Sequence, residues 1–216
     1  MVYGKSRALT SRSYKSPRRT AAASVTRDRI LAAAAALLGK AGEVPRFSLE
    51  SVAKAAAVTR FTVYSQFGSR SALLEAVFDH RALAAGMSRL PEVMADVDAL
   101  SGLQRLIGVF CDFWAHDHDL IARLHSVGAS DPEFSQAVLA RNKRRRLALS
   151  ALVNRMVNSG HVRNAAAPEL VDVLFALTSF SFFAELTAGG RPVEIVCRIV
   201  QNLSADAVRR ANSDTT

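Results

Sequence analysis

The stretch from residue 48 to residue 73 constrains the fold of this chain more than any other part. It reads SLESVAKAAAVTRFTVYSQFGSRSAL. Ser48, Thr59 and Ser69 each precede an apolar helical pattern, and their hydroxyl side chains are of the type that caps helix N-termini. The stretch therefore predicts two short helices joined by a tight turn, with a third helix entered immediately afterwards.

The middle helix of this stretch, residues 60–67, is too short to be stable alone. Val63 and Phe67 are its packing residues. Its other side chains are mostly hydrogen-bond donors that we expect to face outward: Arg60, Thr62, Tyr64, Ser65 and Gln66. A short, rigid helix with outward donors is suited to the major groove of double-stranded DNA.

The charge of the chain is concentrated around the same stretch. Residues 1–70 hold 13 Lys and Arg against 3 Asp and Glu, a net charge of +10, whereas residues 71–216 have a net charge of −1. Such a concentration is the electrostatic footprint of phosphate binding. A membrane surface is the rival partner, but the first predicted helix, residues 27–41, has mostly alanine on its exposed side. We therefore predict DNA as the partner and no membrane.

Composition suggests a cytoplasmic protein. No secretory signal begins the chain, and its strongest apolar run, residues 170–186, is interrupted by polar side chains. Cys111 and Cys197 lie in apolar helical patterns, which favours two buried thiols in a reducing compartment. A redox-sensing pair is the alternative.

We expect three parts along the chain. Residues 1–25 form a disordered arm, because they carry six basic residues, no acidic ones and too little apolar surface for a core. The arm either contacts DNA or is a solvated terminus. Residues 26–70 form the helix-turn-helix domain, whose first helix should stop near Gly42. Residues 71–216 form a regulatory and dimerisation domain.

The pattern stays helical beyond a predicted break at Pro91. We expect helices over residues 98–115, 118–127, 132–158, 167–187 and 192–210. Strand-like alternation does not occur, so the predicted fold class is all-α.

The helix-turn-helix stretch resembles that of the tetracycline-repressor-like (TetR) family of bacterial transcription regulators. The resemblance is carried by Ala53, Ala56, Ala57, Val58, Thr59, Thr62, Val63, Tyr64, Phe67, Ser69, Arg70 and Leu73. It implies a sequence-specific repressor, without enzymatic activity, that is released from a palindromic operator by a small-molecule ligand. Ala57 departs from the usual turn glycine, Gln66 from the usual His or Tyr, and Arg70 from Lys. A left-handed Ala57 would cost about 1 kcal/mol.

Chemistry and resemblance assign the same DNA-binding residues. Hydroxyls, helix-terminal amides and a cation suited to phosphate are supplied by Ser48, Thr62, Tyr64 and Arg70. Thr59, at the start of the same helix as Thr62, is also counted among the DNA-binding residues. Candidates for base edges are Arg60, Phe61, Ser65 and Gln66. For Phe61 the alternative is partial burial against the first helix.

The resemblance also implies a ligand cavity and a dimer interface in residues 71–216. The candidates for lining the cavity are Phe110, Cys111, Trp114, His125, Met156 and Phe175, although aromatic stripes are ordinarily core. The last two helices should form a homodimer interface, through Leu170, Val173, Leu174 and Leu177 on one and Val193, Val196, Ile199, Val200 and Leu203 on the other. Residues 69–90 should form the helix that links ligand to DNA.

Other motifs suggest no further chemistry. Residues 116–119 read His-Asp-His-Asp, but alternate helical residues point apart and no cluster elsewhere completes a metal site, so exposed caps are favoured. The basic run at residues 141–146 favours a solvated face over an acidic partner or a second DNA contact. No nucleophile–base pair, carboxylate pair or phosphate loop supports an enzyme, and no cofactor is expected. An architectural DNA binder would not need so long a near-neutral domain.

Overall fold

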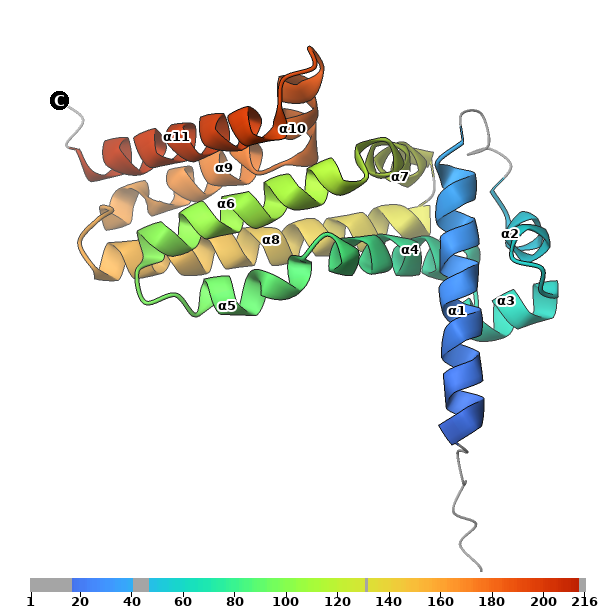
Figure 1. The fold of residues 1–216 in the computed structure, drawn as a ribbon. Helices are drawn as coiled ribbons and strands as arrows, with labels where there is room; N and C mark the ends of the chain where they lie inside the picture. Colours follow the sequence, from blue (N-terminus) through green and yellow to red (C-terminus); the bar gives the residue numbers. More distant parts are fainter. Residues whose placement is uncertain (1–16, 41–46, 131, 214–216) are drawn as a thin grey trace, which may run out of the picture.

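The computed structural model describes residues 17–40, 47–130 and 132–213, and its regular elements are helices (Figure 1). In chain order they are α1 (Pro17–Leu38), α2 (Leu49–Ala55), α3 (Arg60–Phe67), α4 (Arg70–Ala84), η2 (Met87–Arg89), α5 (Leu90–Met94), α6 (Ala99–His116), α7 (His118–Ser130), α8 (Pro132–Asn158), η3 (Asn164–Ala166), α9 (Ala167–Leu177), α10 (Phe180–Thr187) and α11 (Val193–Asn212). The described ranges contain no strand. The predicted all-α fold class is confirmed.

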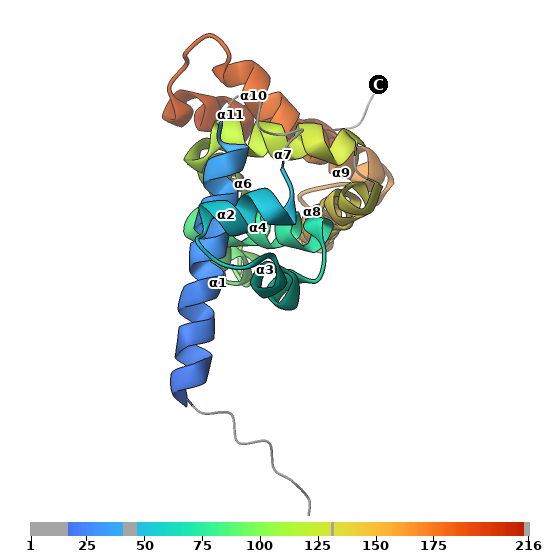
Figure 2. The same cartoon turned by 90° about the vertical axis from the view of Figure 1, so that its right-hand side faces the viewer.

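Two parts are distinct in Figure 1. Helix α1 stands across one end of an elongated bundle, and α2 and α3 lie on its outer side. We call α1–α3 the head and α5–α11 the body. In the body α6, α8, α9 and α11 run side by side, and α4 leads from the head to lie against α8. Figure 2 looks onto the head from its outer side, where α2 and α3 lie in front of the bundle.

The apolar core is divided in the same way, but the division does not follow the chain. The core of the head contains fully buried side chains such as Ile30 and Val63. It also takes in residues from beyond the head: Leu73, Leu74 and Val77 of α4, Leu120 and Leu124 of α7, and Phe134 of α8. The domain boundary predicted after residue 70 therefore coincides with the start of a helix that packs against the head.

Helix α1 is longer at its N-terminus than predicted. It begins at Pro17 instead of residue 27 and ends at Leu38, so residues 17–25 are helical and not part of a disordered arm. Proline is favoured in the first turn of a helix, and the alanines that follow have the highest helix propensity. This propensity extends the helix through residues 21–25, which are exposed. Residues 1–16 and Gly42 lie outside the described residues.

Helix α4 ends earlier than predicted. It stops at Ala84 instead of continuing to residue 90, and Gly86 follows with a φ of 84°. The amide of Gly86 donates to the carbonyl of Leu83 at 3.1 Å, which satisfies an end carbonyl of the helix. A left-handed glycine is a common helix terminator, because glycine adopts positive φ without a steric cost.

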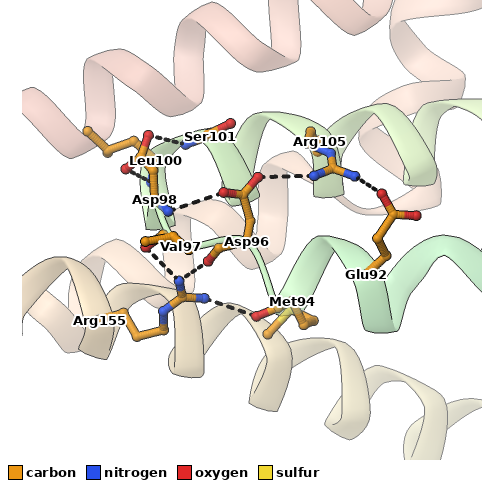
Figure 3. Close-up of polar contacts among 9 residues, drawn as sticks. All are labelled: Glu92, Met94, Asp96, Val97, Asp98, Leu100, Ser101, Arg105 and Arg155. Atoms are coloured by element: carbon orange, nitrogen blue, oxygen red, sulfur yellow. Dashed lines mark hydrogen bonds and ion pairs between the residues drawn. The ribbon is translucent and has the colours of Figure 1, made fainter.

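Pro91 begins a helix and does not mark a break, since it lies in the first turn of α5. The loop after α5 is held by Arg155 of α8, whose guanidinium donates to the carbonyls of Met94 at 3.0 Å, of Val97 at 3.1 Å and of Asp96 (Figure 3). The carboxylate of Asp96 in turn accepts from Arg105 at 3.1 Å. These bonds hold the loop between α5 and α6 against α8.

The predicted helix over residues 167–187 is two helices, α9 and α10, which meet at 49°. Ser179 caps the N-terminus of α10 by accepting from the amide of Phe182 at 3.2 Å. The carbonyl of Thr178 accepts from Nε1 of Trp114 at 3.2 Å. The break therefore has a local cause, a serine cap, and a distant one, an indole donor on α6.

Candidate nucleic-acid interface and effector pocket

The three predicted helix caps are confirmed. Oγ of Ser48 accepts from the amide of Ser51 at 3.1 Å, and the side chain of Ser51 closes a capping box. Oγ1 of Thr59 accepts from the amide of Thr62, and Oγ of Ser69 from the amide of Ala72, both at 3.0 Å. These bonds fix where α2, α3 and α4 begin.

The turn between α2 and α3 contains a left-handed residue. Ala57 has a φ of 50°, the only positive φ of a non-glycine residue in the described ranges. The amide of the next residue, Val58, donates to the carbonyl of Ala53 at 3.0 Å and closes the turn. The turn therefore keeps the conformation of a glycine turn, at a steric cost of about 1 kcal/mol for an L-residue.

One face of α3 points away from the molecule. Phe61 is 78% exposed and Tyr64 is 58% exposed, and Arg60 and Ser65 are also exposed. The opposite face is buried through Val63 and Phe67. The exposure of Phe61 is at odds with burial against α1, the alternative considered for it. The outer face of α3 thus presents an arginine, two aromatic rings and a hydroxyl to solvent.

Other predicted DNA-binding residues are held partly inward. Ser48, Thr62, Gln66 and Arg70 are half-buried, whereas Thr59 is exposed. Nε of Arg70 donates to the carbonyl of Phe47 at 3.1 Å. Arg70 therefore anchors the start of α4 to the segment before α2.

Sequence reasoning missed Arg27 as a support of α3. Its guanidinium lies 4.4 Å from the ring centroid of Phe67 and donates to the carbonyl of Gln66 at 3.3 Å. The residue belongs to α1, so only the tertiary structure brings it to the end of α3. Exposed cations in this part of the chain are Arg29, Lys40, Lys54 and Arg60, and phosphate binding requires such positive charge.

The structure divides the six predicted cavity residues. Phe110, Cys111 and Trp114 line a small cavity together with residues of α9, α10 and α11. Its free space is about 10 Å³, which is room for about one water molecule. Met156 is fully buried in the core of the body but does not line this cavity. The body is therefore closely packed where a ligand cavity was predicted.

The remaining two predicted cavity residues are His125 of α7 and Phe175 of α9, and both lie near the break between α9 and α10. The ring of His125 stacks on that of Phe180 with centroids 5.0 Å apart. The ring of Phe175 lies under the guanidiniums of Arg145 and Arg146, at 4.0 and 4.8 Å. Phe180, Thr178 and Arg145 were not predicted, because their proximity depends on how four helices pack.

The basic run of α8 is only partly a solvated face, which corrects the prediction. Lys143 and Arg144 are exposed. Arg141 instead donates to the carboxylate of Asp79 at 2.6 Å and stacks on Phe78 of α4. Arg145 donates into the end of α9. The run thus joins α8 to its neighbours as well as facing solvent.

Residues 116–119 form the tight connection between α6 and α7. The carboxylate of Asp117 pairs with Arg81 of α4, and the ring of His118 packs 5.4 Å from that of Phe180. These two residues are therefore structural and not simply exposed caps. Within the described residues no group of three or more His, Cys, Asp and Glu side chains could hold a metal ion.

Cys111 and Cys197 are free thiols on α6 and α11. Cys111 is buried and Cys197 is half-buried. A hydrogen bond between the two side chains raises the pKa of Cys111, which burial raises further, and lowers the pKa of Cys197. The two predicted core thiols are therefore neighbours.

About half of the apolar residues predicted for the dimer interface belong to the core of a single chain. Leu170, Leu174, Val196 and Val200 are buried in it. Along α9 and α11 the large apolar side chains left exposed are Val173, Ile195 and Leu203, at 38, 38 and 40%. Within the described residues no single helix is long and apolar enough to cross a membrane, and the bent pair 164–177 and 180–187 meets that test only when its two helices are combined.

Comparison with known proteins covers both parts. Residues 30–77 match the sequence model of the bacterial regulatory proteins of the tetR family. A candidate TetR-family transcriptional regulator from Syntrophomonas wolfei is similar in structure, with a TM-score of 0.71 at 15% identity over 86% of this chain and 95% of that one. The TetR-family transcriptional regulator PfmR from Thermus thermophilus gives 0.64 at 19% identity over 87% and 100%.

A third similar structure was solved with a ligand. It is a candidate transcriptional regulator from Saccharomonospora viridis in complex with choline, with a TM-score of 0.64 at 18% identity over 83% of this chain and 95% of that one. No curated protein sequence matches this chain. At identities this low, the structural similarity establishes the shared fold alone. The family match to residues 30–77 identifies the kind of head that the fold carries.

Proposed function

We propose that this chain, a TetR-family transcriptional regulator by its DNA-binding domain and its fold, is a repressor that leaves a palindromic operator when a small molecule binds its body. It acts as a homodimer in the cytoplasm and is not an enzyme. The observation that carries this proposal is the outer face of α3, where Arg60, Phe61, Tyr64 and Ser65 are exposed on a helix that is fixed from behind.

The residues of the head divide by chemistry into two groups. The exposed Arg60 and Phe61 at the start of α3 are suited to base edges, since arginine pairs with guanine and a phenyl ring packs on a thymine methyl. Ser65 and Gln66 are the polar candidates beside them. Phosphate contacts are assigned to Ser48, Thr59, Thr62, Tyr64 and Arg70, which lie at the N-terminal ends of α2 to α4 or on α3.

A symmetric dimer would place two α3 helices in successive major grooves, about 34–36 Å apart. We assign the dimer interface to α9 and α11, where Val173, Ile195 and Leu203 are exposed apolar side chains available to a second copy of the chain. A small molecule must bind one arrangement of the dimer more tightly than the other, and a coupling free energy of about 1–3 kcal/mol is expected.

The test is binding of the full chain to a palindromic fragment from upstream of its own gene, compared with random DNA by fluorescence anisotropy. Arg60→Ala and Tyr64→Ala should each weaken operator binding about 5- to 150-fold, the equivalent of 1–3 kcal/mol for a base or phosphate contact. Arg144→Ala is the matched control, because it removes an exposed cation from the middle of α8.

All three variants should keep the helical circular-dichroism signal of the wild type. The proposal fails if Arg60→Ala and Tyr64→Ala bind the operator as tightly as the wild type. It also fails if the wild type binds random DNA as tightly as the palindromic fragment.

A further inference from the structure

Arg145 differs from its neighbours on α8 in its partners. The guanidiniums of Arg141 and Arg146 each pair with a carboxylate, that of Asp79 and of Asp172. Among the described residues no carboxylate lies within ion-pair distance of Arg145. Its Nη1 donates to the carbonyl of Phe175 and to Oγ1 of Thr178, both at 3.0 Å.

The position of this charge is energetically unfavourable unless something compensates it. Burial lowers the pKa of Arg145 to about 10, and the nearby charge of Arg146 contributes. The end of α9 supplies a partial negative charge of about half a unit at most. Burial lowers the pKa of His125 and the charge of Arg145 lowers it further. An imidazole is neutral or cationic, so His125 supplies no compensating negative charge.

The guanidinium retains donors that the protein uses weakly. Nη2 has one partner, Oδ1 of Asn142, at 3.5 Å, the upper limit of a hydrogen bond. Arginine binds a carboxylate through two parallel N–H donors when one edge of the guanidinium is accessible. Nη2 is the donor that a carboxylate would take, since Nη1 already donates to Phe175 and Thr178.

A cluster of aromatic rings adjoins this cation. Thr178, which accepts from Arg145 through its hydroxyl, also accepts from the indole of Trp114 through its carbonyl. The ring of Phe180 lies 5.5 Å from that of Trp114 and 5.0 Å from that of His125. A cation and three aromatic rings thus converge on the break between α9 and α10.

We propose that the effector is an organic monoanion, a carboxylate with an apolar body. Its carboxylate binds Arg145, and its body enters between Trp114 and Phe180. The inference rests on the proposed function and names the chemical class of the ligand. A quaternary ammonium such as choline, which the relative from Saccharomonospora viridis binds, would meet the uncompensated guanidinium and be repelled.

The same contacts provide a route to the head. The ring centroids of Trp114 and Phe180 are only 5.5 Å apart, so an apolar body that enters between them has to displace Phe180 and, with it, α10. Phe180 stacks on His125 of α7, and Arg123 of the same helix donates to the carbonyl of Leu38, the last residue of α1, at 3.1 Å. A displacement of Phe180 is therefore transmitted to the head through α7.

The test uses the fluorescence of Trp114, the single tryptophan of the chain. The full-length protein is titrated with 3-phenylpropanoate and octanoate, with the neutral isostere 3-phenylpropanamide, and with choline. At least one carboxylate should change the emission saturably, and it should bind about tenfold or more tightly than the amide, as expected for a hydrogen-bonded ion pair. Choline should not compete with it.

Arg145→Met should weaken carboxylate binding by about tenfold or more. Arg146→Met, which removes the exposed neighbouring cation, should not. Circular dichroism checks that both variants are folded. If Arg145→Met does not fold, the comparison of carboxylate with amide on the wild-type protein decides.

The proposal is overturned if the amide binds as tightly as the acid, or if folded Arg145→Met binds the carboxylate unchanged. It is also overturned if neither carboxylate alters the emission at up to about 10 mM, a limit weaker than any useful effector affinity. None of these results affects the operator-binding test with Arg60→Ala, so failure of the ligand class and failure of the repressor function are distinguishable.

Discussion

Hydrogen bonds between near neighbours in sequence set the helix ends of the head, whereas contacts between distant segments set several of those in the body. Ser48, Thr59 and Ser69 each cap a helix by accepting from the amide three residues later. The break after α9 combines a local cap by Ser179 with a hydrogen bond from Trp114, on another helix. Yet the core of the head includes side chains from α7 and α8. A shape that is specified locally can still depend on distant segments for its stability.

The largest test of this dependence is Phe134→Ala. Phe134 is fully buried and comes from α8, but it packs in the core of the head. Removing a buried phenyl ring should lower the free energy of unfolding by about 3–5 kcal/mol. Urea denaturation followed by circular dichroism measures this loss.

The matched control is Leu139→Ala on the same helix, where the side chain is 58% exposed. Its effect should stay within about 0.5 kcal/mol, as for most surface substitutions. Equal effects of the two substitutions would show that the core of the head does not depend on Phe134 of α8 for its stability.

A smaller effect is expected from a local cap. Ser69→Ala removes the acceptor of the Ala72 amide at the start of α4, which should cost about 1 kcal/mol of unfolding free energy. Ser65→Ala is its control, because Ser65 is exposed within α3 and its hydroxyl donates to a carbonyl of the same helix. If the cap contributes no more than Ser65, local bonds do not set the start of α4.

The smallest effect should come from the left-handed turn. Ala57→Gly removes a steric cost of about 1 kcal/mol but adds up to about 1 kcal/mol of unfolded-state entropy, so the net gain is a few tenths of a kcal/mol. Ala36→Gly, at an exposed position inside α1, should instead lose about 1 kcal/mol. Opposite signs in thermal unfolding support the strained turn, and a loss at both positions would exclude it.

The same contrast explains what could be predicted from the sequence. Ser48, Thr59 and Ser69 lie directly before the helices that they cap, so the limits of α3 followed from a short window. The break at Thr178 and the environment of Arg145 could not be predicted, because they depend on α6 and α9 packing against α8. The early start of α1 at Pro17 could not be predicted for another reason. Apolar periodicity does not detect a helical segment that forms because of the high helix propensity of alanine.

The bond from Arg123 to the carbonyl of Leu38 bears on the construction of chimeric regulators. Exchanging the head of one regulator for that of another is attractive when the two parts are independent modules. Here the last carbonyl of α1 receives its donor from α7, across 85 positions of the chain. A transplanted head therefore keeps this hydrogen bond only if the recipient body carries a long cationic donor at the position of Arg123. Compatibility between donor and recipient would have to be judged at that pair of positions as well as at the splice point.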